Sequence, residues 1–325
     1  MTALLLFACA CAPSPPPQQQ RAPRIVASQV HQLPLQLEEP FADAEFSSIW
    51  WDGDDLLILP QYAGEKGRGI LALQRDSIGR AIEELRAGRE PRPLRPRVIT
   101  TEVSGVRDSI SDYDGLEAVA VRDGRCFVLA EFGHEGGTAW GSRLVYGTVE
   151  REHGSIRFDS LGQTSLEGPQ MRSNYTHEAM VLADEELWVL CELNGRAVTE
   201  LPLLMRYSLD LQPRGTWPMP ALEYRISDAT NLDDQGRFWV INLFWPPDAE
   251  IVGASGELPI ERLVPLRFTG QRIEVDPERA WLDLRGDEER PMYNWEGVAR
   301  WGEEGFLLVT DSYPEDLLAY VERPE

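Results

Sequence analysis

Basic charge is scarce in this sequence. Its 31 lysine and arginine residues stand against 54 aspartate and glutamate residues, which gives a formal net charge of −23 at pH 7. Such a protein is repelled by the phosphates of nucleic acid and by anionic membrane surfaces, so we expect no nucleic-acid partner. Lys66 is the only lysine, which leaves a single candidate for chemistry at a lysine amine.

A hydrophobic run long enough to span a bilayer is also missing. The short apolar run near the N-terminus, residues 3–8, leads into Leu6-Phe7-Ala8-Cys9, which resembles the lipobox of bacterial lipoproteins, where the cysteine is lipidated. The proline- and glutamine-rich residues 13–20 would then serve as a tether. We therefore expect residues 1–23 to be signal and tether. The protein would lie in the bacterial cell envelope (periplasm or outer membrane), attached to the membrane only through lipid on Cys9. An ordinary cleaved signal and a chance apolar start are the alternatives.

Cysteine is rare beyond the N-terminal segment. Cys126 and Cys191 lie in apolar runs, and neither belongs to a Cys-x-x-Cys or other metal-type spacing. We predict two buried thiols, with a disulfide between them as the alternative. Familiar catalytic motifs are missing too: there is no Gly-x-Ser-x-Gly elbow, phosphate-cradling glycine loop or His-Glu-x-x-His.

An internal repeat is the strongest pattern that the sequence does contain. Two apolar runs around a turn recur five times, and an acidic residue often marks the start and the end of the unit. The two marked positions are fourteen residues apart in every copy: 47 and 61, 117 and 131, 178 and 192, 228 and 242, 296 and 310. Short β-rich runs around a turn form a hairpin. We predict the turns midway, at Asp54, Gly124, Glu185, Gln235 and Glu303.

The spacing of the copies predicts the fold. They begin 50 to 70 residues apart, at positions 47, 117, 178, 228 and 296, which is room for the four strands of a propeller blade. We predict an all-β chain in which residues 24–325 form a single β-propeller of five blades, or six if a weak repeat is hidden. A β-sandwich gives no reason for the constant offset. The strand at 317–321, with residues 24–30, would complete the last blade. One short helix, residues 76–87, would decorate a blade, capped by Asp76 or Ser77. We expect a monomer.

The repeat also predicts a ring of carboxylates. In a regular hairpin the first marked residue lies across from the last, so Glu117 would face Glu131, and Glu178 would face Glu192. First strands of blades usually line the channel, which would bring the acids to one mouth. Crowded carboxylates need a compensating cation, and Ca²⁺ takes about six to eight oxygen ligands. We therefore predict a Ca²⁺ site at this mouth, with these ligands: Glu117, Glu178, Asp228, Glu296 and, across from Asp228, Asn242. The alternative is an acidic mouth that is simply solvated.

Three segments resemble the bacterial propeller family named for the "esterase-like activity of phytase". They are residues 114–118 (Asp-Gly-Leu-Glu-Ala), 294–299 (Asn-Trp-Glu-Gly-Val-Ala) and 307–312 (Leu-Leu-Val-Thr-Asp-Ser). The likeness covers about residues 40–325 and implies an exported propeller that hydrolyses phosphoesters. Residues 231–239 are also similar to the gluconolactonase/senescence-marker family, whose channel metal is held by Glu, Asn and Asp. Phytase-type sites hold phosphate with several basic residues, and here only arginines such as Arg143, Arg172 or Arg225 could do so.

Two functions fit these observations. The first is a Ca²⁺-dependent hydrolase of phosphoesters, esters or lactones, in which the metal polarises the substrate and Glu131, Glu192 or His177 transfers a proton. The second is a non-catalytic envelope propeller that binds a small molecule, a glycan or a protein at the channel mouth. Hydrolysis that disappears with chelator would favour the first.

Replacing Cys9 tests the anchor. Expression with the native upstream start should give a membrane-associated protein that Cys9→Ser releases into the soluble fraction, because a lipidated cysteine is the only attachment that the sequence predicts. Fractionation and mass spectrometry of the N-terminal peptide measure this. Wild-type protein that is soluble and unmodified would contradict the prediction.

Overall fold

Strands make up most of the structure. The computed structural model describes residues 23–324, apart from residue 42, the side chains of residues 159–161 and five segments: 134–139, 167–174, 253–257, 287–289 and 313–314. Cys9 and Arg172 therefore lie outside the described residues. Among those that are described, no helix is long and apolar enough to cross a membrane.

Four hydrogen-bonded sheets contain all the strands of the described chain. The largest holds β3 (Phe46–Asp52), β4 (Asp55–Pro60), β5 (Ile70–Gln74), β6 (Arg97–Glu102), β7 (Tyr113–Arg122), β8 (Arg125–Phe132), β9 (Gly141–Glu150) and β10 (Ser155–Ser165). The next holds β11 (His177–Ala183), β12 (Glu186–Cys191), β13 (Leu203–Ser208) and β14 (Pro213–Pro218). The third holds β15 (Arg225–Ala229), β16 (Arg237–Phe244), β17 (Ile260–Phe268), β18 (Ile273–Val275), β19 (Trp281–Asp283) and β1 (Ile25–Ala27). The last holds β20 (Trp295–Trp301), β21 (Gly305–Thr310), β22 (Leu318–Glu322) and β2 (Val30–Leu33).

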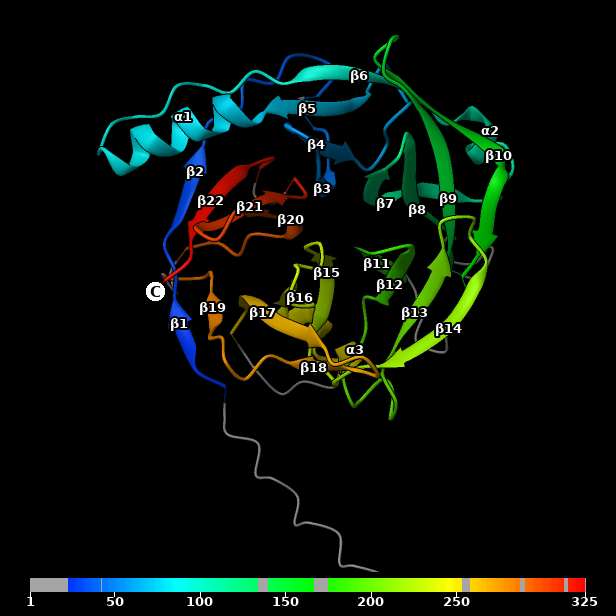
Figure 1. The fold of residues 1–325 in the computed structure, drawn as a ribbon. Helices are drawn as coiled ribbons and strands as arrows, with labels where there is room; N and C mark the ends of the chain where they lie inside the picture. Colours follow the sequence, from blue (N-terminus) through cyan, green and yellow to red (C-terminus); the bar gives the residue numbers. More distant parts are fainter. Residues whose placement is uncertain are drawn as a thin grey trace, which may run out of the picture.

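The sheets are arranged around a common centre (Figure 1). Their innermost strands contact one another in a closed ring, in the order β3, β7, β11, β15, β20 and back to β3. The largest sheet contributes two antiparallel meanders to this ring, joined at their outer edges by a parallel pairing of β6 with β10. Antiparallel meanders placed radially around an axis form a β-propeller. The all-β propeller predicted from the repeat is therefore the observed fold.

The second strand of each meander explains why the repeat contains apolar runs. The second strand of each meander is buried along its length, apart from half-buried residues at the ends of β4, β8, β12 and β16. On β21, for example, all six residues from Gly305 to Thr310 are buried. Burial of this kind contributes roughly 1.5–3 kcal/mol for each large apolar side chain.

The turns lie where the fourteen-residue offset predicts them. Asp54, Gly124, Glu185, Gln235 and Glu303 all fall between the first and second strands of their hairpins. The turn between β7 and β8 shows the local reason. Asp123 and Gly124 have φ angles of 51° and 77°, the left-handed pair of a type I′ turn, which Asp-Gly sequences favour.

A β-bulge interrupts every one of these hairpins. The register shifts between Phe46 and Ser48 on β3, between Leu116 and Ala118 on β7, and at the matching place on β11, β15 and β20. The predicted pairing of Glu117 with Glu131 and of Glu178 with Glu192 is therefore wrong. Gly115 is the partner of Glu131, and Glu117 is the extra residue of its bulge.

The chain closes its ring with its own N-terminal segment. β2 pairs antiparallel with β22, from Val30 opposite Val321 to Leu33 opposite Leu318. β1 instead pairs parallel with β19 in the neighbouring sheet. The expectation that residues 24–30 complete the last sheet is thus corrected: residues 30–33 do so.

The predicted helix is α1 (Arg75–Arg86), and it packs through Ile78, Ala81 and Ile82. The expected cap is not observed, because the N-cap position is Gln74, whose side chain makes no capping hydrogen bond. Three shorter helical elements were not predicted: α2 (Ser104–Arg107), η1 (Pro246–Asp248) and α3 (Ala249–Val252). Cys126 and Cys191 are both buried free thiols, as the first reading of the cysteines expects.

Leu33 on β2 is the position from which ring closure can be tested. It is 2% exposed, and removing a buried leucine side chain costs about 2–5 kcal/mol. Leu33→Ala should lower the urea midpoint clearly. Ile25→Ala on β1, where the side chain is 54% exposed, should change it little. Equal shifts in the two variants would show that the β2–β22 pairing is not needed for stability.

Candidate functional site

The bulges bring glutamates from several strands into one cluster. Glu117 on β7, Glu178 on β11 and Glu296 on β20 hold the marked position of their strands, and each lies at a register shift. Glu131 ends the apolar run of β8, and Glu192 directly follows β12. The charges of these side chains act on one another, so they lie within electrostatic reach. We call this set the acid cluster: Glu117, Glu131, Glu178, Glu192 and Glu296.

Every side chain of the acid cluster is buried. Their exposed fractions run from 0% for Glu192 to 7% for Glu178. Five ionised carboxylates in such a place would be strongly destabilising, because burial and mutual repulsion both disfavour the charged form. The cluster therefore requires compensating charge, bound protons or both.

Arg225, at the start of β15, is the compensating cation within the described chain. Its Nε donates to Glu192 Oε1, its Nη2 lies 3.6 Å from Glu296 Oε1, and its Nη1 lies 3.8 Å from Asp248 Oδ2. Burial alone lowers the pKa of Arg225, but the carboxylates of Glu192 and its neighbours outweigh it and raise that pKa above its ordinary value. One guanidinium thus faces three carboxyl groups.

Two neutral side chains also hold the acid cluster. Thr176 donates its hydroxyl to Glu131 Oε1 at 2.7 Å. Gln61, the residue that ends the first repeat, donates its amide to Glu117 Oε1 at 3.2 Å. These bonds fix the two carboxyl groups in orientation while leaving each a second oxygen.

Raised pKa values favour the neutral form of the carboxyl groups that Arg225 does not contact. Burial, helped by the charge of Glu117, raises the pKa of Glu131 to about 9 against the Thr176 hydrogen bond. Burial and the charges of Asp311 and Glu192 raise the pKa of Glu117 to about 8, although the Gln61 bond lowers it.

The pKa values of the other three members of the acid cluster shift in the same direction. Burial and the neighbouring glutamates raise the pKa of Glu178 well above its usual range. Burial also raises the pKa of Glu296 well above its usual range, against the pull of Arg225. The pKa of Glu192 rises through burial too, but Arg225 and a hydrogen bond with Glu178 oppose the rise. Glu192 is thus the carboxylate with the strongest local support for its charge.

Asp228 occupies the same repeat position as Glu117, Glu178 and Glu296 but makes different contacts. Its Oδ2 accepts from the backbone N–H of Val298 at 2.8 Å and from the Ser48 hydroxyl at 3.4 Å. It therefore bridges β15 to both β20 and β3 across the ring. Burial raises its pKa, and hydrogen bonds from the backbone of Val298 and Ala229 oppose the rise. Its role as a metal ligand stays a prediction.

Asn242 and His177 also form hydrogen bonds with residues outside the acid cluster. Asn242 donates to the backbone oxygens of Glu223 and Arg225 at 3.0 Å each and accepts from Arg262, so its amide is engaged in holding loops. His177 is fully buried. Its Nδ1 lies 3.0 Å from the Ser142 hydroxyl, and burial lowers its pKa to about 4, which keeps the ring neutral. No contact of His177 with the acid cluster is recorded among the described residues.

The fit of a calcium ion can be judged from these contacts. Thr176, Gln61 and Arg225 each take up a carboxylate oxygen that a metal would need. Within the described part of the chain, no group of three or more His, Cys, Asp or Glu side chains is placed to hold a metal ion. The arrangement thus fits protons and a guanidinium better than Ca²⁺, and the calcium site stays a prediction.

Some members of the site were not predicted from the repeat. Arg225 precedes its repeat unit by three positions, and the sequence indicates for it only a possible role in holding phosphate. Asp311, whose pKa burial raises to about 6, follows the last marked position. Asp248 belongs to η1 and accepts from the Tyr175 hydroxyl at 2.9 Å. The repeat carries no signal for residues outside its two marked positions.

Comparison with known proteins adds little beyond the topology. No family model matches the chain. A segment of 77 residues, 23% of this chain, is 40% identical to the phenylalanine–tRNA ligase β subunit of Methanothrix thermoacetophila, but it spans only 14% of that subunit.

Similar solved structures share low identity with this chain. An exo-1,5-α-L-arabinanase from a bovine ruminal metagenomic library has a TM-score of 0.48 and 9% identity, over 89% of this chain and 96% of that one. An α-L-arabinanase of Cellvibrio cellulosa has a TM-score of 0.43 and 12% identity, over 84% and 89%. A DUF4623 family protein from Bacteroides eggerthii has a TM-score of 0.43 and 11% identity over 84% of this chain. The chain spans about half of that protein, 52%. These values assign neither a family nor an activity.

The raised pKa values predict how stability depends on pH. A glutamate with a raised pKa stays protonated in the folded chain while the unfolded chain releases its proton. The stability that it contributes is therefore full below about pH 4.5 and is lost as pH rises towards 8–9. Glu131→Gln, which mimics the protonated side chain, should raise stability at pH 8 by more than ~1 kcal/mol and flatten this dependence.

Thermal melts from pH 5 to 9 measure this effect. Glu152→Gln, at an exposed turn, is the matched control and should leave the profile unchanged. If the wild type gains stability between pH 5 and 8, or if Glu131→Gln melts like the control at every pH, the acid cluster does not hold protons in the folded state.

Proposed function

We propose that the acid cluster is the active site of a hydrolase that acts on an uncharged polar substrate, such as an ester, a lactone or a glycoside. One observation carries the proposal. A carboxyl group that keeps its proton at neutral pH, Glu131, and a carboxylate supported by a guanidinium, Glu192, belong to the same buried cluster. Both pKa values are raised, but of these two groups it is Glu192 whose charge a guanidinium stabilises, and such a difference in surroundings suits Glu131 to the role of general acid and Glu192 to that of general base.

The roles follow from the local contacts. Glu192, held by Arg225, removes a proton from the attacking water. Glu131, oriented by Thr176, gives its proton to the oxygen that leaves when the C–O bond breaks. Water adds to the substrate carbon, so the products are an acid and an alcohol, or two sugars, and the two protons balance. Glu178, which bonds to Glu192, positions the base.

The charge of the site favours an uncharged substrate over a phosphoester. Arg225 already faces Glu192, Glu296 and Asp248, so it has no free charge for a phosphate. Arg143, the other described candidate, donates to Gln163 at 2.7 Å. A phosphoester would therefore meet carboxyl groups that lack a free basic partner, and repulsion would weaken its binding.

The remaining parts of the proposal concern the whole protein. Counting one blade for each innermost strand of the ring gives five, and we propose a five-bladed propeller in preference to six. The likeness to the phytase-related family, the envelope location and the lipid on Cys9 are parts of the same proposal. Calcium remains an alternative source of compensating charge, and the assay below includes it.

A second candidate function is binding without catalysis. The low exposure of the acid cluster, at most 7% for any member, favours it, because a substrate needs access to both carboxyl groups. In that case the channel mouth would recognise a small molecule, a glycan or a protein. The protonated carboxyl groups would then act as hydrogen-bond donors only.

Hydrolysis by the full-length protein tests the proposal. We expect turnover of at least one substrate in a panel of p-nitrophenyl acetate, δ-valerolactone and p-nitrophenyl glycosides, and none of p-nitrophenyl phosphate. Glu131→Gln and Glu192→Gln should each lower kcat by about 100-fold or more. Glu152→Gln, which lies at an exposed turn, should retain full activity.

The pH profile and the chelator separate the alternatives. Activity should fall as pH rises past 8–9, where Glu131 loses its proton, and should survive EDTA. Activity that EDTA removes and Ca²⁺ restores would replace this mechanism with metal-assisted hydrolysis. Folded protein that is inactive on the whole panel, with and without Ca²⁺, would leave binding as the function.

A further inference from the structure

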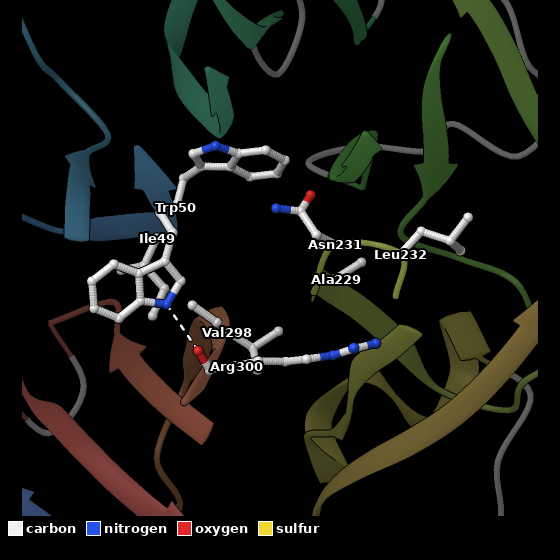
Figure 2. Close-up of a pocket in the computed structure, with 9 residues that line it drawn as sticks. Ile49, Trp50, Ala229, Asn231, Leu232, Val298 and Arg300 are labelled. Atoms are coloured by element: carbon white, nitrogen blue, oxygen red, sulfur yellow. Dashed lines mark hydrogen bonds between the residues drawn. The ribbon is translucent and has the colours of Figure 1, made fainter. Parts of the chain in front are cut away.

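Two unpaired polar atoms of the described chain lie around the pocket in Figure 2: Oδ1 of Asn231 and Nε of Arg300. Both atoms are buried, and Trp50 on the same lining is 4% exposed. This pocket therefore presents neither atom to a ligand.

A larger pocket, of about 320 Å³, is open to solvent. It lies where β1, the start of β17 and the end of β19 meet, and these strands are neighbours in the third sheet (Figure 1). Its lining includes Ile25, Leu258, Arg262 and Asp283, and we call it the β1 pocket. None of its eight lining residues is buried, and none belongs to the acid cluster. A ligand can therefore contact its side chains directly from solvent.

Arg262 on β17 is held in place but lacks a counter-ion. Its Nε donates to Asn242 Oδ1 at 2.8 Å, and its guanidinium carbon lies 4.5 Å from the centre of the Trp281 ring and 5.2 Å from that of Tyr224. Its two Nη groups have no hydrogen-bond or ion-pair partner among the described residues, and neither is among the fully buried unpaired atoms there. Burial lowers the pKa of Arg262 to about 10, although Tyr224 and Asp283 oppose the fall. The side chain is thus a cation at neutral pH with both Nη groups available.

Asp283, the last residue of β19, carries the opposite charge. It is the register partner of Arg262, so the two side chains leave the sheet on the same face, with Cβ atoms roughly 4.5–5.5 Å apart. Their partners differ, however, because Asp283 Oδ1 accepts from the backbone N–H of Arg285 at 3.0 Å, whereas Arg262 donates to Asn242. A cation and an anion of the described chain therefore line one pocket without forming an ion pair with each other.

The remaining charge on the lining is already matched. Arg285 Nη1 lies 3.3 Å from Glu261 Oε1, and its Nη2 donates to the backbone oxygen of Arg290 at 3.2 Å. Arg262 and Asp283 are therefore the charged groups that the β1 pocket offers to a ligand.

The rim of the β1 pocket is apolar. Leu258 is 60% exposed and Ile25 is 54% exposed, and Ile260 lines the pocket between them and Arg262. Large apolar side chains are stabilised when a ligand removes them from water. A ligand that fits the pocket therefore combines a positive group, a negative group and an apolar group.

We propose that the β1 pocket binds a free α-amino acid with an apolar side chain, such as leucine. The carboxylate and the ammonium group of an α-amino acid are attached to one carbon atom, so the molecule can meet two opposite charges on neighbouring strands at once. Its carboxylate accepts from the Nη groups of Arg262, its ammonium group donates to Asp283, and its side chain covers Leu258 and Ile25. The volume lies at the lower end of the roughly 300–1,000 Å³ of small-molecule pockets, which suits one molecule of this size.

Calorimetry with the full-length protein tests this inference. L-leucine should show saturable binding. 4-Methylpentanoate, which lacks the ammonium group, and 3-methylbutylamine, which lacks the carboxylate, should each bind about tenfold more weakly or worse, the effect of losing one charged hydrogen bond. Glycine, which lacks the side chain, should also bind more weakly than L-leucine. No saturation by L-leucine up to about 100 mM, or equally tight binding of either single-charge analogue, would overturn the inference.

Two variants separate the roles of the two charges. Asp283→Asn keeps the oxygen that accepts from Arg285 but removes the charge, so it should weaken binding of L-leucine about tenfold without weakening that of 4-methylpentanoate. Arg262→Gln should weaken binding of L-leucine without weakening that of 3-methylbutylamine. A variant that has merely unfolded would bind none of these ligands, and thermal melts identify it.

Arg214→Gln and Asp234→Asn are the matched controls, because both residues are exposed and lie outside the β1 pocket. Both controls should bind L-leucine as the wild type does. Binding that Asp283→Asn and Arg262→Gln leave unchanged, or that the controls weaken equally, would overturn the inference. Because the acid cluster takes no part, failure of the hydrolase assay leaves this test intact.

Discussion

The bulge in each innermost strand is the constraint on which the rest of the molecule depends. One extra residue at the same place in every hairpin shifts the register and gives that residue a direction that a regular strand would not allow. Three of these positions hold glutamates of the acid cluster. A fourth, Asp228, ties β15 to its neighbours through Val298 and Ser48. The same bulge thus positions the carboxyl groups of the site and, at Asp228, a side chain that forms hydrogen bonds across the ring.

Charge compensation then determines what the acid cluster can do. Arg225 neutralises part of its negative charge, and burial raises the pKa values of four members, which favours their neutral form: Glu117, Glu131, Glu178 and Glu296. Protonated carboxyl groups donate hydrogen bonds, whereas carboxylates only accept them. Because Arg225 lies directly against Glu192, farther from Glu296, and forms no ion pair with Glu117 or Glu131 within the described chain, chemically identical side chains acquire different roles from their surroundings.

Much of the architecture could be predicted from the sequence, because apolar runs around a turn recur with a constant offset. This pattern can be recognised without knowing which distant residues contact each other. The turn at Gly124 and the buried run of β21 were fixed by residues close together in the chain. The register of the hairpins could not be predicted, since a bulge leaves the hydrophobic pattern almost unchanged. The prediction that Glu117 pairs with Glu131 is wrong for this reason. The partners of Asn242 and His177 could not be predicted either, because Arg262 and Ser142 lie in other strands.

The pairing of β2 with β22 has a consequence for how the chain folds. These strands are about 290 residues apart in the sequence, as Val30 and Val321 show, so the ring can close only after all the strands between them have been made. Closing so long a loop carries an entropy cost that grows slowly with length, and contacts this distant in sequence slow folding. The pairing of β2 with β22 is therefore expected to form late in folding, after the contacts between strands that are neighbours in the sequence.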